Sequence, residues 1–361
     1  MKKIYIIAAA ALALAACTKS EVFAPESSAI NFAPNALNTK TLILPDSDSP
    51  EQLAFPTDET FSVFAFADLG TGAGTNYTTP LMDDVEISYQ GGDWKAATGT
   101  YLWPATGTVD FYAYHPASLA ATFDSANDPK GISLTGISLG TTVGNQIDPL
   151  VASVLAQASA NKPKVGLVFK HITSQIAVTA FDATTIASLQ NKITIKSVVF
   201  KNMNTSGDYR EGTTTGKGAW TNVNTTTDFT SFSGAEVLST TESFLSAGSF
   251  SSAINNSAAF VTIPVDIING AAGQSIDVTY SIAAYTINGF DYPATPDQTV
   301  NIPLYNRVSA NKFQNGKRYV FHLGISLDGA NNEIMFSPKV EGWETEDITG
   351  ITIDAVNAGL M

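Results

Sequence analysis

Residues Phe61–Phe66, with the sequence Phe-Ser-Val-Phe-Ala-Phe, form a nearly continuous apolar run. Such a run predicts a β-strand buried on both faces, because a half-buried strand would alternate apolar and polar residues. Short runs rich in Thr, Val, Ile, Phe and Tyr recur along the chain between clusters of Gly, Asn, Ser and Pro. This texture favours an all-β fold.

Further strands are predicted on both sides of this run. The clearest are Val85–Tyr89, Thr108–Tyr114, Lys192–Lys196, Ile276–Ile282 and Tyr319–Ile325. Many short strands between turn signals favour two β-sandwiches in tandem. The punctuation at residues 162–164 (Lys-Pro-Lys) places the boundary between an N-terminal domain over residues 29–164 and a C-terminal domain over residues 165–361.

Four segments have weaker patterns, and one dipeptide, Asn288-Gly289, is a clear turn signal. Ala29–Ala33 predicts a short first strand that ends at Pro34, since proline cannot donate to a ladder. The proline-containing residues 35–59 predict a loop. Asp148–Ala160 is the best candidate for a helix, with Asp148 as its cap. The polar residues 202–257 predict hairpin tips or a decorated insertion, and Asn288-Gly289 predicts a type I′ hairpin turn.

The composition excludes one class of partner. The chain has 361 residues with 19 Lys and Arg against 33 Asp and Glu, a formal net charge of −14. Binding to nucleic acid phosphates requires basic clusters, so we expect no nucleic-acid partner. Cys17 is the only cysteine, so burial of apolar residues must stabilise the fold without an internal disulfide.

The N-terminus predicts export. Lys2 and Lys3 precede the short apolar run Ile4–Ala16, which is a secretory signal peptide pattern. The sequence Leu-Ala-Ala before Cys17 resembles a bacterial lipobox, in which the cysteine is diacylated and becomes the new N-terminus. We therefore expect a signal peptide over residues 1–16, lipidation at Cys17, and a tether over residues 17–28 outside the cytoplasm; the alternative is an ordinary signal peptide with an incidental cysteine.

No motif for catalysis or for a cofactor is found in the sequence. The loop Gly70–Gly74 has the wrong glycine spacing for a phosphate loop and no lysine, so we expect a hairpin loop there. His115, His171 and His322 are not at metal-ligand spacing, so we expect histidines with ordinary hydrogen bonds. No nucleophile elbow is found. We expect no catalytic residue, no metal and no cofactor.

Exposed tryptophans are the remaining candidates for ligand contact, because aromatic faces stack on sugar rings. Trp94 and Trp103 lie beside predicted strands, so we expect them in the core. Trp220 lies in a polar region and is the candidate surface contact. A surface lipoprotein that binds glycans through Trp220 is therefore an alternative function.

Several motifs, taken in chain order, resemble the fimbrillin-type lipoproteins of Bacteroides-like bacteria. They are Ile30–Phe32, Phe61–Phe66, Trp94, Tyr101–Pro104, Val109–Pro116, Val165–Ile172, Gly316–Tyr319 and Val340–Trp343. The resemblance implies two transthyretin-like β-sandwich domains and a role as a structural subunit of a type V pilus or as an associated adhesin. The implied partners are other pilus subunits, the outer membrane through the lipid anchor, and a host protein or glycan.

The resemblance also implies an assembly mechanism. In that family a protease cuts a loop after the first strand, the strand leaves with its lipid, and a strand of another subunit fills the groove. Here Ile30 and Phe32 would occupy the groove, and Ile351 and Ile353 are candidate donors.

The chain departs from the family at the processing site. Processing in the family follows arginine, whereas Lys40 is the only basic residue between Lys19 and Lys95. Anchor and tip subunits of the family are not all cleaved. A copy that is not cut at Lys40 would stay lipidated, as an anchor or surface adhesin.

Overall fold

The computed structural model describes residues 29–36, 53–142, 146–161, 164–245, 259–327 and 344–345. These residues form β-strands joined by loops and by short 3-10 helices, namely Ser159–Asn161, Ala187–Leu189 and Ser309–Asn311. The predicted all-β class is confirmed. None of the helices in this part of the chain has the length and apolar character needed to cross a membrane.

Strand β3 (Phe61–Asp68) contributes to two separate cores. Phe61 and Val63 enter a cluster enclosed by the first sheet, which we call the inner core. Phe64 and Phe66 enter a cluster on the opposite face, which we call the junction core. These four side chains are between 0% and 3% exposed. The prediction of a strand buried on both faces is therefore confirmed.

The first sheet closes on itself around the inner core. Its strand order is β10-β9-β6-β3-β4-β5-β1-β2, and an additional pairing between β1 and β10 joins the ends. The strands are β1 (Phe32–Ala36), β2 (Leu53–Ala54), β4 (Met82–Gln90), β5 (Asp93–Ala96), β6 (Thr108–His115), β9 (Leu150–Ala158) and β10 (Val165–His171).

The other two large sheets face each other across a third cluster, the sandwich core, which includes Ile176, Ile195, Phe200, Val278 and Phe321. One sheet contains β11 (Ser174–Asp182), β14 (Ser243–Phe244), β15 (Phe260–Thr262), β20 (Lys317–Ile325) and β21 (Glu344–Thr345). The facing sheet contains β7 (Ala120–Asp124), β8 (Gly131–Ser138), β12 (Ile193–Arg210), β13 (Ala219–Val237), β16 (Ser275–Ile282) and β19 (Gln298–Pro303).

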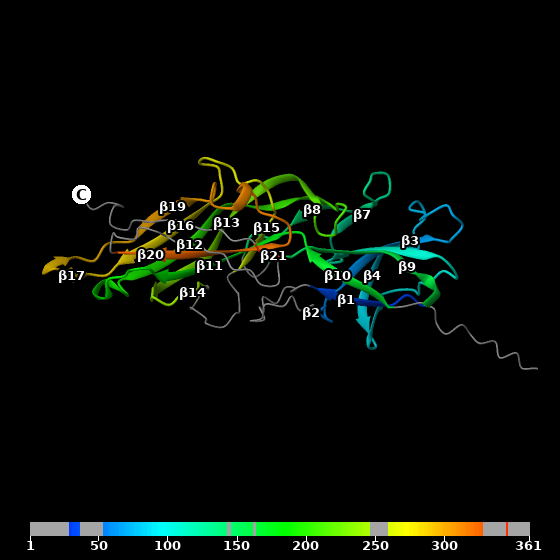
Figure 1. Ribbon diagram of the computed structural model, residues 1–361, viewed down its shortest axis with the longest axis horizontal. Coiled ribbons are helices and arrows are strands. Elements are labelled where there is room, and N and C mark those ends of the chain that lie inside the picture. Colours follow the sequence, from blue (N-terminus) through cyan, green and yellow to red (C-terminus); the bar gives the residue numbers. More distant parts are fainter. Residues whose placement is uncertain are drawn as a thin grey trace, which may run out of the picture.

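The molecule is elongated, with the closed sheet towards one end and the hairpin of β17 (Tyr285–Ile287) and β18 (Phe290–Tyr292) at the other (Figure 1). Asn288 and Gly289 connect these two strands with φ angles of 53° and 79°. Positive φ at both central residues is the requirement of a type I′ turn, so the predicted hairpin is confirmed.

Strand β12 connects the sandwich to the closed sheet. Its first part, residues 193–201, pairs with β16, whereas residues 206–210 pair with β8. The junction core lies where β8 and the end of β12 pack on the closed sheet, and it includes Leu134, Tyr112 and Tyr209. A hairpin from the first half of the chain, β7–β8, thus extends a sheet of the second half.

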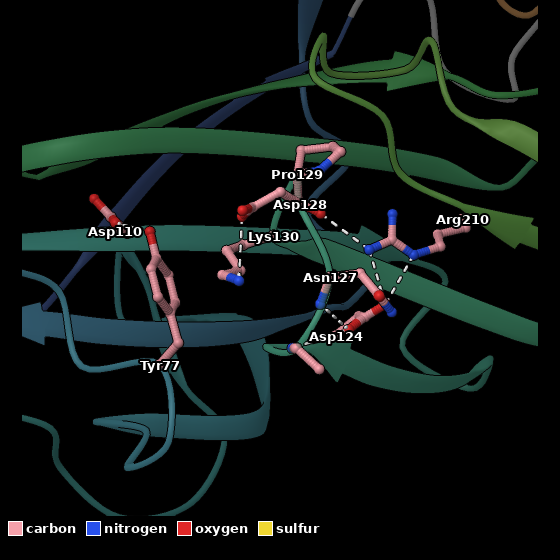
Figure 2. A network of polar contacts seen from close by, with 9 residues as sticks. Tyr77, Asp110, Asp124, Asn127, Asp128, Pro129, Lys130 and Arg210 are labelled. Carbon is pink, nitrogen blue, oxygen red and sulfur yellow. Dashed lines mark hydrogen bonds and ion pairs between the residues drawn. The ribbon is translucent and has the colours of Figure 1, made fainter.

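Arg210 fixes this hairpin to the end of β12 (Figure 2). Its Nε and Nη2 atoms lie 2.9 and 2.8 Å from Asp124 Oδ2, and Nη2 also donates to the carbonyl oxygen of Pro129 at 2.9 Å. Hydrogen bonds from the Asn127 side chain and backbone, followed by that from Arg210, hold the pKa of Asp124 well below its usual range. The carboxylate therefore stays ionised and keeps this contact at neutral pH.

The structure corrects three predictions about local structure, in whole or in part. The candidate helix Asp148–Ala160 is largely strand β9, because its apolar residues pair with β6 across the closed sheet. Within residues 202–257, the described part contains the end of β12, the whole of β13 and the short β14. The β12–β13 hairpin agrees with the predicted hairpin, but both strands belong to the sheet that contains β16 and are not an added insertion. The predicted loop over residues 35–59 contains β2, which pairs with β1.

The sheet boundary differs from the boundary expected at residues 164/165. Strand β10 pairs with β1 and β9 in the closed sheet, so the chain passes to the sandwich at residues 172–173. Strands β7 and β8 precede this expected boundary in the sequence, yet they belong to the same sheet as β12, which follows it. The extents of two separate domains, 29–164 and 165–361, remain a proposal.

We predict that Leu134→Ala lowers the free energy of unfolding by about 2–5 kcal/mol, the usual cost of a cavity at a buried leucine. Leu134 is 0% exposed in the junction core. The control Leu155→Ala changes a leucine that is 57% exposed, and we expect less than about 0.5 kcal/mol. Chemical denaturation followed by circular dichroism measures both, and equal losses would contradict the junction core.

Candidate strand-exchange site

Strand β1 is held by both of its edges. It pairs in parallel with β10 over the whole of Phe32–Ala36, from Phe32 opposite Val165 to Ala36 opposite Phe169. On its other edge Phe32 lies opposite Trp94 of β5, and the last two residues pair with β2. Upstream, Ile30 N donates to Tyr101 O at 2.8 Å. The strand therefore closes the gap between β5 and β10.

The side chains of β1 and the residue pair before it alternate with period two. Ile30, Phe32 and Pro34 are buried, whereas Ala33 is exposed. The Phe32 ring, 2% exposed, meets Phe61 and Phe111 edge to face, with centroid distances of 5.9 Å to each. The burial of Ile30 and Phe32 places both predicted groove-filling residues in the inner core.

Proline at position 34 lies inside β1, so the prediction that it ends the strand is wrong. Val165 N donates to the carbonyl oxygen of Asn31, the residue before β1, at 2.8 Å. The backbone of Asn31 therefore faces β10. Because alternate residues of a strand bond to the same neighbour, Ala33 and Asn35 also face β10 and Pro34 faces away. The missing N–H of Pro34 is therefore not needed by the β1–β10 ladder.

Phe55 covers the groove from the side of β2 and was not found by sequence reasoning. It is 2% exposed, and its ring lies 5.5 Å from Phe61, 5.4 Å from Trp94 and 5.0 Å from Phe169, centroid to centroid. The available signal was the apolar run Leu53–Phe55 directly before a proline. The prolines around it favoured a loop and concealed this short strand.

An ion pair joins the two strands on either side of β1. Lys164 Nζ contacts Asp93 Oδ1, and these residues lie next to Val165 and Trp94, the two partners of Phe32. The hydrogen bond from Lys164 holds the pKa of Asp93 below its usual value. Both side chains are exposed, so we assign the pair a positioning role and a small contribution to stability.

Four predicted site residues lie outside the described residues, namely Cys17, Lys40, Ile351 and Ile353. Trp220 is described, and it is half-buried. Its Nε1 donates to Ile172 O at 2.9 Å and its ring packs on Tyr209 at 5.3 Å. The ring is therefore not the freely exposed platform that the sequence predicted, whereas Trp94 and Trp103 are buried as expected.

The histidines have ordinary hydrogen-bond partners, as predicted. Nδ1 of His115 lies 2.8 Å from Thr60 O, and Nδ1 of His171 lies 2.7 Å from Asp148 Oδ2. His322 contacts Thr179 and Glu242. Within the ranges that the structure describes, no three His, Cys, Asp or Glu side chains come together as a metal site.

The loop Gly70–Gly74 connects β3 to β4, and Gly70, Gly72 and Gly74 have φ angles between 72° and 82°. Positive φ is strained for residues with a side chain, which explains the three glycines as turn residues. The predicted hairpin loop is confirmed.

The fold and the site together define a class: an all-β protein whose first strand closes a sheet through backbone pairing on both of its edges. Comparison with protein families identifies the family. The model of the fimbrillin-like family matches residues 39–343, and the chain belongs to this family. A comparison with curated protein sequences gives no match.

Solved structures with similarity to this chain include two from Bacteroides. A candidate cell adhesion protein of Bacteroides uniformis ATCC 8492 is 17% identical, with a TM-score of 0.45 and coverage of 82% of this chain and 94% of that chain. A fimbrial protein of Bacteroides vulgatus ATCC 8482 is 15% identical, with a TM-score of 0.46 and coverage of 82% and 95%.

We predict that Phe32→Ala destabilises the closed sheet by about 3–5 kcal/mol, because it leaves a cavity between Phe61 and Phe111. Hydrogen exchange should accelerate at the amides of β10. The control Ala33→Ser changes the neighbouring exposed position and should have an effect within about 0.5 kcal/mol. Unchanged exchange in β10 after Phe32→Ala would contradict the closing role of β1.

Proposed function

We propose that the protein is a structural subunit of a type V pilus, or an adhesin associated with one, and that it assembles by donor-strand exchange. The observation that carries the proposal is the placement of β1, which buries Ile30 and Phe32 while its backbone pairs with β5 and β10. The family membership supports the same role.

The pairing of β1 is suited to replacement. Its interactions are main-chain hydrogen bonds and alternate buried side chains, which any apolar strand of the same period can supply. Removal of β1 would leave the β10 edge and the inner core exposed. Such an edge pairs readily with a strand of another chain, so a cut made only after export would prevent early aggregation.

A cut in the segment between β1 and β2 would separate β1 from the rest of the sheet, and Lys40 lies in that segment. The donor in our proposal is the C-terminal segment of another subunit, with Ile351 and Ile353 placed where Ile30 and Phe32 lie. These two isoleucines are two residues apart, as are Ile30 and Phe32, and therefore share one face of a strand.

The lipid anchor completes the proposed localisation. A diacylated Cys17 would hold the uncut protein at the outer membrane, because two acyl chains anchor stably where one does not. A copy cut after Lys40 would lose this anchor and enter the pilus. A copy that stays uncut would act as anchor or adhesin, with a host protein or glycan as its ligand.

We favour the structural role over the glycan-binding alternative based on Trp220. The Nε1 atom of Trp220 is engaged by Ile172 O and one part of its ring by Tyr209, which leaves less of the indole for a sugar. A structural role also needs no catalytic residue.

We predict that Lys40→Ala abolishes the shortening of the mature protein at the cell surface and the formation of oligomer ladders. The change removes the proposed cleavage residue while leaving β1 intact. Immunoblotting of surface fractions and N-terminal sequencing measure the result, with Thr41 expected for the cut wild type. Lys95→Ala, at an exposed lysine of β5, is the control. Normal ladders from Lys40→Ala would exclude the proposed cleavage.

A double change of Ile351 and Ile353 to Asp should stop polymer growth after cleavage, because two carboxylates cannot enter the apolar groove without a large desolvation cost. The matched control is Thr352→Asp, which places one charge on the opposite face of the same segment. Oligomer size by electrophoresis measures both. If all variants polymerise equally, the donor strand lies elsewhere.

A further inference from the structure

The turn between β12 and β13, residues 211–218, lies where the closed sheet meets the sandwich; we call it the junction turn. Thr215 Oγ1 lies 2.6 Å from Ser153 Oγ of β9. Gly216 packs closely against Lys170 of β10: a Cβ atom added to Gly216 would lie only 2.7 Å from the Cβ atom of Lys170. On the sandwich side, Asn315 Nδ2 donates to Gly218 O at 2.9 Å. The junction turn therefore contacts both parts of the molecule.

A nearby contact ties the same turn to the crossover of the chain between the sheets. Trp220 follows the junction turn and donates through Nε1 to Ile172 O. Gly316 N, next to Asn315, donates to Thr173 O at 2.8 Å. Residues 172–173 carry the chain from the closed sheet to the sandwich. The position of the junction turn therefore affects how firmly the two parts are joined.

The Glu211 carboxyl lies inside this turn and is 5% exposed. Its Oε1 accepts a hydrogen bond from Gly216 N at 2.9 Å, and its Oε2 lies 3.5 Å from Tyr209 Oη. The Tyr209 hydroxyl in turn accepts a hydrogen bond from Gly218 N at 2.8 Å. One short backbone hydrogen bond and one long side-chain contact are weak compensation for a buried charge.

The charged groups of neighbouring elements point to other partners. Arg210 binds Asp124 and Pro129 O, and it reaches Glu211 only at the backbone carbonyl, 3.1 Å from Nη1. Before β8, Lys130 pairs with Asp128.

The remaining groups around the turn give the carboxylate no positive partner either. On β10, Lys170 meets the turn through its aliphatic carbons, and His171 pairs with Asp148. Lys217 Nζ lies 3.4 Å from Asn315 O. Burial is the main cause that raises the pKa of Tyr112 of β6, and the Glu211 charge adds to that rise, so Tyr112 offers no positive charge either. In the described part of the chain, Glu211 therefore has no ion-pair partner.

Burial is the largest cause and raises the pKa of Glu211 to about 7, while the hydrogen bonds from the Gly216 amide and the Tyr209 hydroxyl oppose it. An unfolded glutamate has a pKa of roughly 4.3. The folded junction turn therefore binds one more proton than an opened turn between about pH 4.3 and 7. Because the folded pKa is raised, stability is greatest at low pH and is lost as the pH rises through this window.

We propose that Glu211 is a proton-operated latch: the neutral carboxyl holds the junction turn against β9, β10 and the crossover, and ionisation loosens it. Loosening would make the joint between the closed sheet and the sandwich more flexible. Glu211 acts here as a positioning residue, through the backbone of Gly216 and the side chain of Tyr209.

Hydrogen exchange of the full chain at a series of pH values tests the latch. The quantity to compare is the protection factor of the Gly216 and Gly218 amides, because it is already corrected for the intrinsic pH dependence of exchange. It should fall by about tenfold per pH unit between pH 5 and 7. It should become constant above about pH 8. A wild-type protection factor that changes less than twofold over this whole range would overturn the proposal.

Two variants separate titration of Glu211 from a general effect of pH. Glu211→Gln keeps the oxygen that accepts from Gly216 N but cannot ionise, so its protection factor should be flat from pH 5 to 8. The matched control Glu236→Gln removes a partly exposed carboxyl elsewhere on the same hairpin and should keep the wild-type slope. A tenfold slope that persists in Glu211→Gln would show that another group titrates. The test uses no polymer, so it stands apart from the proposed role in a pilus.

Discussion

The parallel pairing of β1 with β10 is the interaction on which the first sheet depends. It joins β10, the first strand in the strand order, to β1, the last but one. It also holds β1 in place with Ile30 and Phe32 in the inner core. Without it, β10 and β5 would each present unpaired N–H and C=O groups, which are costly when buried and prone to pairing with other chains when exposed. This single strand therefore pairs with both neighbouring strands and also covers the inner core.

A different constraint joins the closed sheet to the sandwich. Strand β12 is continuous, and its two parts pair with β16 and with β8. The closed sheet and the sandwich are therefore joined by a shared strand and by the apolar contacts of the junction core. Arg210 adds an ion pair that holds the β7–β8 hairpin on β12. The molecule thus combines one strand that closes the first sheet with another, continuous strand that joins the closed sheet to the sandwich.

Two buried carboxylates near these cores differ in how they are compensated. Asp110 accepts from Tyr77 Oη at 2.6 Å, from Thr75 Oγ1 at 3.1 Å and from Ala156 N at 2.7 Å. Three donors make it a stable fixed point for a β-bulge and for the loop before β4, with Tyr77 turned towards it in Figure 2. Glu211 has one short hydrogen bond, which is why burial dominates its pKa.

The sequence by itself determined the all-β class, the doubly buried strand around Phe64 and the Asn288-Gly289 hairpin, because these follow from local periodicity and turn chemistry. The role of Ile30 and Phe32 as groove-filling residues came from the family resemblance instead. The tertiary structure alone decided that residues 148–160 are mostly strand, that Pro34 lies within β1, that Phe55 covers the groove, and that Glu211 is buried with no ion-pair partner among the residues the structure describes. Each of these depends on which distant segments pair or pack together, and no short stretch of sequence contains that information.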